Sequence, residues 1–425
     1  MRLPFTPIAE RLAPARLGSG FRWLLAATVV NNAGDGVVVS AGPLLVASQT
    51  RDPFLVSLAI LMEYLPALIF GVVAGAAADR FDRQRQVVAA NLGRAVVLAV
   101  LVATVVSGSV NISIVLGALF LLGTAETFAD AASSTLVPNL VSSADLGAAN
   151  ARMQGGLLLT NQLLMPPLGA FLFVLGMWLP FAVNALAFLL GAVLVSRIVV
   201  SMRAVRTPSS WRADMSEGVR WLLGHPPLRT LALTIVTFNV TFGAAWSVLV
   251  LYAPERLGMN EIGFGLLTTA VAVGGVFGVL GYGWLERRFA LADIMRGGLV
   301  IETGTHLVLA ITTSPVVALG TLVVFGAHSF VWGTTAVVVR QRAVPDELLG
   351  RVTGVYRVAI VAGIVVGTPL GGLLARAYGI TAPFWFGFIG SAVLVTLLWR
   401  EFARIAHAGA GHSAGAAGGP TAGPS

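Results

Sequence analysis

Acidic side chains inside apolar segments are the groups of this sequence that could carry chemistry. Asp35 and Glu63 lie in two consecutive apolar segments. A carboxylate in hydrocarbon is costly, so it usually faces a water-filled cavity or a partner. At about 1.5 Å per helical residue, Asp35 is roughly 21 Å from one end of its segment and Glu63 roughly 15 Å from the opposite end of the next. At such similar depths the two disfavour each other's ionised form, so the pair is predicted to exchange a proton. The alternative for Asp35 is a packing or capping role beside Gly34 and Gly36.

A second acidic pair accompanies an arginine at similar depth. Glu126 and Asp130 are four residues apart, and therefore on one helical face. Arg94 lies about 12 Å into the preceding segment from the same side. We expect an Arg94–Glu126 ion pair and keep Glu126 as a further proton-binding candidate. A structural ion pair with Arg80 or Arg83 is the favoured interpretation of Asp130.

Glu302 and His306 form an acid–imidazole pair at helical spacing, and His328 lies at mid-depth in the following segment. Such a pair can relay protons. A hydrogen-bonded pair without that role is the alternative. The potential metal ligands are too few and too dispersed for a metal site. We therefore expect no metal or cofactor, with a proton gradient as the energy source.

Amides and aromatic rings in the apolar segments could line a cavity for an apolar substrate. Anchoring at the membrane interface or helix packing is the alternative for each ring. The candidates are Asn31, Asn32, Asn239, Phe242, Trp246 and Trp332.

The composition places most of the chain in lipid. Of 425 residues, 56% are hydrophobic and 11% are charged, whereas soluble domains average about 25% charged residues. The mean hydropathy is +0.86. All 27 basic residues are arginine and there is no cysteine, which excludes a phosphate-binding Gly-Lys-Ser/Thr loop, a Schiff-base lysine and a cysteine nucleophile. The sequence therefore argues against an enzyme. Arginines scattered between apolar segments also argue against nucleic-acid binding.

Twelve segments are long and apolar enough to cross a bilayer, which takes about 20 residues. The first of them is long enough to span and lacks a signal-peptide cleavage site, so we predict that it is retained. The predicted spans are 21–48, 53–78, 87–107, 111–135, 152–176, 179–200, 228–253, 262–285, 291–313, 315–339, 352–377 and 382–400.

Arginine placement predicts the orientation. With the N-terminus in the cytoplasm, 23 arginines fall on the cytoplasmic side, three on the other side and one, Arg94, within a span. Cytoplasmic loops carry an excess of basic residues. Both termini are therefore predicted to be cytoplasmic, in the inner (plasma) membrane. The loop between the sixth and seventh spans contains an amphipathic stretch, 211–223, expected to lie on the membrane surface.

The two halves of the sequence repeat each other. One shift of 207 residues aligns identical residues in several spans and loops. Such duplicated halves build transporters whose binding site lies between them near the bilayer midplane. The matched pairs include Asn32 with Asn239, Gly36 with Gly243, Gly71 with Gly278, and Arg80 with Arg287.

The loop after the second span reads Gly71-Val-Val-Ala-Gly-Ala-Ala-Ala-Asp-Arg-Phe-Asp-Arg-Gln-Arg85. It resembles the signature G-x-x-x-D-R-x-G-R-R of the major facilitator superfamily, with Asp82 in place of a glycine. That departure resembles the drug and siderophore exporter branch, which includes enterobactin exporters, macrolide efflux pumps and lysophospholipid transporters. The stretches 217–229 and 340–351 resemble the same branch.

The resemblance implies a conformational latch. Gly71 and Gly75 are four residues apart, a spacing that permits close helix contact. Asp79 ends its helix, where its charge opposes the helix dipole, so it should seek a partner. The resemblance implies that this partner is the start of the eleventh span, near residues 350–353. The predicted latch comprises Gly75, Asp79, Arg80, Arg83 and Asp130, and a charged turn that only sets topology is the alternative.

The sequence thus predicts an all-α membrane protein with the major facilitator fold, twelve helices in two six-helix bundles. The predicted divisions are 1–20, a cytoplasmic segment; 21–200, the first bundle; 201–227, a linker; 228–400, the second bundle; and 401–425, a disordered tail. We expect a monomeric secondary transporter that exports an apolar or amphipathic small molecule in exchange for protons. A lipid-type transporter and a non-transporting scaffold or sensor are the alternatives.

Overall fold

The computed structural model describes residues 15–198 and 211–401, and all regular structure within them is helical. The predicted N-terminal segment and C-terminal tail fall largely outside these residues. In the first part of the chain the helices are α2 (Gly18–Gln49), α3 (Pro53–Arg80), α4 (Arg83–Val106), α5 (Ile112–Leu140), α6 (Leu146–Leu157), the π-helical η3 (Leu158–Leu164), α7 (Met165–Leu175) and α8 (Leu179–Ser196). In the second part they are α9 (Trp211–Gly224), α10 (Pro226–Trp246), α11 (Leu249–Leu257), α12 (Glu261–Arg288), α13 (Leu291–Ile311), α14 (Pro315–Ala343), α15 (Asp346–Tyr378) and α16 (Ala382–Leu398). Short 3-10 turns at Ala15–Leu17 (η1) and Ser143–Asp145 (η2) precede α2 and α6.

Within residues 15–198 and 211–401, each of the twelve predicted spans corresponds to helical structure. Eleven of the described helical segments are long and apolar enough to cross a bilayer, and α16 is a shorter apolar helix. The fifth span is a continuous helical run from Ser143 to Leu175. The seventh is divided into α10 and α11 at Ser247 and Val248.

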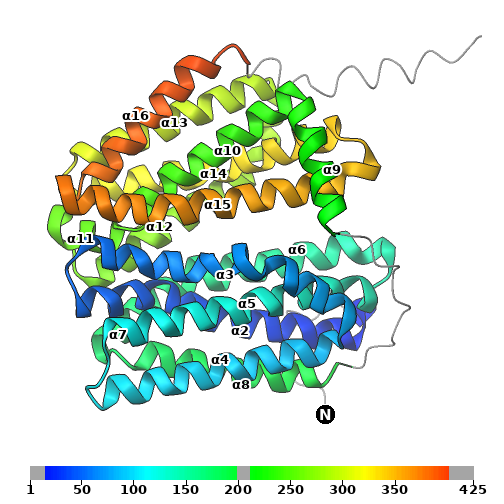
Figure 1. Ribbon diagram of the computed structural model, residues 1–425, viewed down its shortest axis with the longest axis vertical. Coiled ribbons are helices and arrows are strands. Elements are labelled where there is room, and N and C mark those ends of the chain that lie inside the picture. Colours follow the sequence, from blue (N-terminus) through cyan, green and yellow to red (C-terminus); the bar gives the residue numbers. More distant parts are fainter. Residues whose placement is uncertain (1–14, 199–210, 402–425) are drawn as a thin grey trace, which may run out of the picture.

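The helices form two bundles (Figure 1). The N-terminal bundle contains α2 to α8 and the C-terminal bundle α10 to α16, stacked along the long axis of the view. The main contacts between the bundles are those of α3 with α15 and of α7 with α12. These pairs are the second and eleventh spans and the fifth and eighth spans, so the two crossings are related by the internal repeat.

Glycines allow the closest helix pairs to form. Gly363, Gly367 and Gly371 lie at four-residue spacing on α15 and face the backbone of α10 at Val236, Val240 and Ala244. A side chain at any of these glycines would collide with that backbone. Small residues at this spacing bring membrane helices into van der Waals contact where burial of apolar surface supplies no driving force. The glycine-rich pattern of the eleventh span is therefore a packing face.

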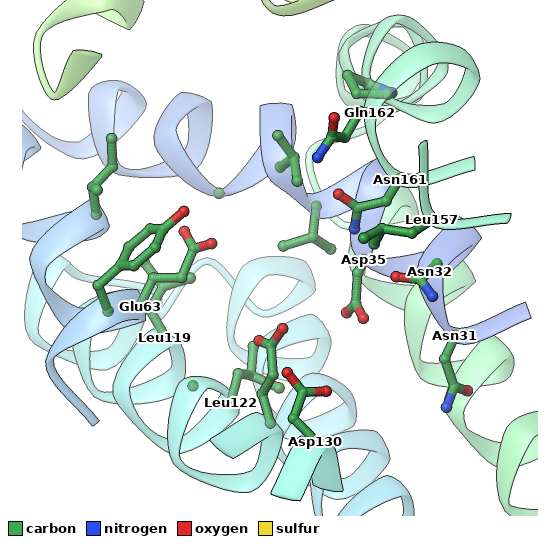
Figure 2. A pocket seen from close by; sticks show the side chains of 18 of the residues that line it. Asn31, Asn32, Asp35, Glu63, Leu119, Leu122, Asp130, Leu157, Asn161 and Gln162 are labelled. Atoms are coloured by element: carbon green, nitrogen blue, oxygen red, sulfur yellow. The ribbon is translucent and has the colours of Figure 1, made fainter. Parts of the chain in front are cut away.

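Proline shapes the fifth span. Pro166 and Pro167 have no backbone N–H to donate, and their rings crowd the preceding turn. The chain relieves this by widening into η3, where the N–H of Met165 donates to Thr160 O. Such π turns are rare and frequently occur at functional sites. Asn161 and Gln162 of η3 line the central cavity (Figure 2).

The amphipathic stretch forms α9, but the structure does not place it as a separate surface helix. Leu222 is buried with Leu228 and Val352 at the adjoining ends of α10 and α15. Glu217 pairs with Arg351 at 2.9 Å, and Gly218 lies against the Arg351 carbonyl. A helix therefore forms over the predicted stretch, and part of its apolar face packs on the C-terminal bundle, while Val219 and Leu223 remain exposed.

The two ends of the molecule differ. The Arg-rich end, where α3 ends at Arg80 and α15 begins at Asp346, leaves open space beside Gly75 and Gly350. At the opposite end the bundles touch. There Gly372 of α15 lies against Ser57 of α3, and Gly265 of α12 lies against Ala170 of α7. The structure is therefore closed at the end opposite the arginines.

Cysteine labelling will test the orientation predicted from the arginines, because the native chain has no cysteine. Ser109 and Ser143 are exposed, lie just beyond the two ends of α5, and differ from cysteine by one atom. Ser109→Cys should react with a membrane-impermeant maleimide in intact cells. Ser143→Cys should react only after the membrane is permeabilised. The opposite pattern would reverse the orientation, and equal labelling of both in intact cells would refute a span between them.

Candidate functional site

A central cavity of about 800 Å³ lies between the bundles. Its lining extends from Asn150 and Ser134, near the Arg-rich end, to Val56 and Val250, near the closed end. The N-terminal bundle supplies most of the polar side chains that line it. Figure 2 shows Asp35, Glu63 and Asp130 among the side chains that line it, with Asn32 and Asn161 near Asp35.

Arg94 is the buried cation of this site. Its side chain is 5% exposed and lies 3.9 Å from both Asp35 Oδ2 and Glu126 Oε2. Its guanidinium also covers the Phe188 ring, with 4.8 Å between the guanidinium carbon and the ring centroid. The expected Arg94–Glu126 pair is therefore confirmed. Asp35 is a second partner of the same arginine, so one guanidinium faces two carboxylates at the cavity wall.

Asparagines hold α2 against its neighbours at this depth. Asn184 of α8 donates to Asp35 Oδ1 at 3.5 Å, and Asn31 donates to Asn91 Oδ1 of α4 at 3.3 Å. The Asn184 amide lies against Gly34 of α2, and the Asn31 amide against Gly191 of α8. The two helices thus exchange asparagine–glycine contacts, and one of these asparagines orients Asp35.

The remaining charged groups face the cavity from both bundles. Glu63 and Asp130 line it, and both are exposed to it. Arg357 of α15 lines the same cavity and interacts electrostatically with Asp130. The expected pairing of Asp130 with Arg80 or Arg83 is not formed among the described residues. Arg83 instead donates to the carbonyls of Ala78 and Thr135.

The C-terminal bundle contributes an aromatic wall. Phe242 and Trp246 line the cavity and stack with centroids 5.1 Å apart. The two other candidates of this bundle lie elsewhere. Trp332 is buried against Phe238. Asn239 donates to Ile235 O and packs against Gly363. All four residues were candidates because they lie in apolar segments, but only Phe242 and Trp246 line the cavity between the bundles.

Glu302 and His306 contact each other, as expected, but outside the cavity lining. His306 Nε2 is 3.3 Å from Glu302 Oε1, and His328 Nε2 is 3.1 Å from Glu302 Oε2. All three side chains are buried inside the C-terminal bundle. Within the described residues, no group of three acidic, histidine or cysteine side chains has an arrangement suited to a metal ion.

Among the described residues, the contacts predicted for a latch are not made in this conformation. Asp79 and Arg80 are exposed, and no ion pair of either is found among residues 15–198 and 211–401. Gly71 and Gly75 have no neighbour within 4 Å of an added Cβ atom, so the close contact expected of them is not made here. At the start of α15, Arg351 is held by Glu217.

Several functional side chains escaped the sequence reasoning. Four of them are amides inside apolar spans, and that position was the sequence signal that could have identified them: Asn91, Asn161, Gln162 and Asn184. Arg357 lies so near the end of its span that it was counted among the cytoplasmic arginines that set the orientation. Their roles depend on which face each helix turns inward, and hydropathy does not report that.

Comparison with known proteins decides the family. The family model described as transmembrane secretion effector, of the major facilitator superfamily, matches residues 9–412. The chain belongs to this family. Family and fold are those of a multi-pass membrane transporter, which confirms that the protein is not an enzyme.

Relatives of this transmembrane secretion effector include named pumps. The multidrug efflux pump Tap of Mycolicibacterium fortuitum is 28% identical over 386 residues, covering 85% of this chain and 90% of Tap. The uncharacterized MFS-type transporter YfiS of Bacillus subtilis is 26% identical over 388 residues, covering 86% and 89%.

Solved structures agree on the fold. A bacterial homologue of the iron transporter ferroportin in an inward-facing state has a TM-score of 0.70 at 17% identity, covering 91% of this chain and 98% of that one. The nucleoside transporter NupG has a TM-score of 0.70 at 11% identity, covering 91% and 99%. At such identities the likeness shows the major facilitator fold alone.

The asparagine–glycine contact between α2 and α8 generates a stability prediction. Gly191→Ala places a methyl group on the Asn31 amide and should lower the free energy of unfolding by about 1–3 kcal/mol, the usual cost of overpacking. Gly93→Ala is the matched control, because Gly93 also lies within a helix but has open space beside it. Thermal unfolding in detergent measures both, and Gly191→Ala should cost less stability in an Asn31→Ala background than in the wild type, because the collision is then absent. Equal unfolding temperatures for the two single variants would refute the contact.

Proposed function

We propose that this protein is a secondary active transporter that expels apolar or amphipathic small molecules in exchange for protons. The observation that carries the proposal is the cavity wall itself. Four carboxylates and two guanidiniums line a membrane-embedded cavity that also carries an aromatic wall. The multidrug efflux pumps among the relatives support the direction of transport and the class of substrate.

Proton exchange follows from the charge balance at Arg94. One guanidinium faces both Asp35 and Glu126, and Glu63 and Asp130 add two further carboxylates to the same wall. Carboxylates in excess of their counter-ions inside a membrane repel one another. Taking up a proton relieves this repulsion, and a cation that enters the cavity relieves it as well. Proton and substrate can therefore exclude each other without touching the same atom.

The lining favours certain molecules over others. Phe242 and Trp246 offer ring faces to apolar groups, and ring faces also attract cations. The excess of carboxylates disfavours anions. A substrate with an apolar body that is neutral or positively charged fits both walls. The cavity volume of about 800 Å³ is within the range of about 300–1,000 Å³ known for drug-sized ligands.

Alternating access follows from the two bundles. The Arg-rich end, which the arginine bias assigns to the cytoplasm, is open, and the other end is closed where α3 meets α15 and α7 meets α12. Rocking of the bundles about these crossings would expose the cavity to the other side. In the opposite conformation Asp79 would reach the start of α15, where Glu217 of α9 now holds Arg351.

Neutralising Asp35 will test the proton exchange. Asp35→Asn keeps the shape of the side chain but removes the charge that Arg94 and Asn184 contact. In inverted vesicles, export is measured as uptake into the lumen. The rate of uptake of a lipophilic dye cation, driven by a pH gradient, should fall at least about tenfold, equivalent to about 1.4 kcal/mol.

Glu255→Gln is the control, because it removes an exposed carboxylate outside the central cavity. This variant should transport like the wild type. If Asp35→Asn transports at full rate and still requires the gradient, Asp35 is not the coupling group. If dye extrusion by the wild type is independent of the proton gradient, the proposed function is wrong.

The latch and α9 should bias the two conformations in opposite directions. Ser134 is exposed and lines the cavity near the Arg-rich end, so Ser134→Cys reports that opening. Asp79→Asn should increase maleimide labelling of this cysteine, and Glu217→Gln should decrease it. Since exposed ion pairs contribute about 0.2–1 kcal/mol, changes of up to about fivefold in the ratio of conformations are expected. Shifts in the same direction would contradict the exchange of partners at α15.

A further inference from the structure

We propose that Glu302, His306 and His328 form a proton-binding site that is separate from the central cavity. The three side chains come from α13 and α14 and meet at one carboxylate. Each imidazole approaches a different oxygen of Glu302, at 3.3 Å for His306 and 3.1 Å for His328. His328 Nε2 is hydrogen-bonded to the carboxylate, so a proton can be shared between them, and a charge on His306 would lie directly beside the other carboxylate oxygen.

Charge balance requires the cluster to bind a proton. The side chains are 4–7% exposed, and within the described residues the two imidazoles are the electrostatic partners of Glu302. Among residues 15–198 and 211–401, no ion pair joins the cluster to another charged side chain: α16 presents Gly387 to His306, and α14 itself presents Phe325 to His328. A carboxylate and two neutral imidazoles have a net charge of −1. One additional proton, held anywhere among the three groups, makes the cluster neutral. An unpaired buried charge is costly, so the interior favours this neutral state.

Aromatic rings close the cluster off from the cavity. Phe242, which lines the cavity, stacks on Phe325 with centroids 6.0 Å apart. Phe325 and His328 in turn pack in a T-shaped arrangement, with 6.2 Å between their ring centroids. The proton site therefore lies two rings behind the cavity surface. A proton held there does not compete directly with substrate, unlike one held at Asp35.

Proton binding should also affect helix packing. The His306 ring lies against Gly387 of α16, and the His328 ring shares Gly298 of α13 with Trp332. Charging or discharging an imidazole in such close contact alters the packing of three helices of the C-terminal bundle. The site would thus tune the transport cycle to pH, independently of the exchange proposed for the cavity.

The indole of Trp332 provides a spectroscopic test. The fluorescence difference between the wild type and Trp332→Phe isolates the indole that packs beside His328. In purified protein this difference should show a transition between about pH 5 and 9, where imidazole and carboxylate charges can change. Glu302→Gln and His328→Gln should each abolish it. Asp35→Asn should leave it unchanged, because Asp35 belongs to the other bundle.

Two outcomes would overturn the proposal: a wild-type difference signal that is flat across this range, or one that is identical in the wild type and His328→Gln. Glu302→Gln leaves one acceptor oxygen for two buried imidazoles and could fail to fold, so His328→Gln supplies the independent arm. The efflux rate of His328→Gln should also lose part of its pH dependence while retaining its maximum. If the transition is present but efflux ignores the proton gradient, the proton site stands and the proposed function fails.

Discussion

A buried arginine organises the N-terminal bundle. Arg94 is almost completely inaccessible, yet it lies at a depth where a charge without partners would be very costly. Two carboxylates, one aromatic ring and the asparagines around them compensate for it, and they come from α2, α5 and α8. The positions of these helices are therefore tied to one guanidinium. Because both carboxylates stand at the cavity wall, the same group links packing to what the cavity contains.

The two bundles share an architecture but not a chemistry. The N-terminal bundle exposes four carboxylates to the cavity, whereas the C-terminal bundle presents rings and Arg357 there and keeps Glu302, His306 and His328 buried. The repeat aligns Asn32 with Asn239, yet Asn32 lines the cavity and Asn239 packs against α15. Duplicated backbones thus leave each half free to specialise, since the side chains that face the partner bundle are few.

Hydropathy predicted all twelve spans, and arginine counting separated the two ends. Both signals are local, because lipid imposes the same demand on every residue of a span. The Arg94–Glu126 and Glu302–His306 pairs were also predictable, from depth and helical spacing. The partners of Asp130, Asn31 and Asn184 were not, because they depend on how each helix is rotated about its axis. The division at Ser247 and the π turn before Pro166 were also not predicted, because hydropathy does not report a local change of helix geometry.

Glycines bring the two bundles into close contact at the closed end. Gly372 meets the first turn of α3, and Gly265 meets the prolines of the fifth span, while Asp52 and Arg376 form an ion pair of 3.5 Å beside the first of these contacts. Surfaces without rotatable groups can slide over each other without changing rotamers, so little conformational entropy is lost or regained as they turn. Side chains therefore do not interdigitate at these two glycine contacts. The resistance to motion would then come from charged groups, namely the Asp52–Arg376 pair at this end and the charged groups at the Arg-rich end.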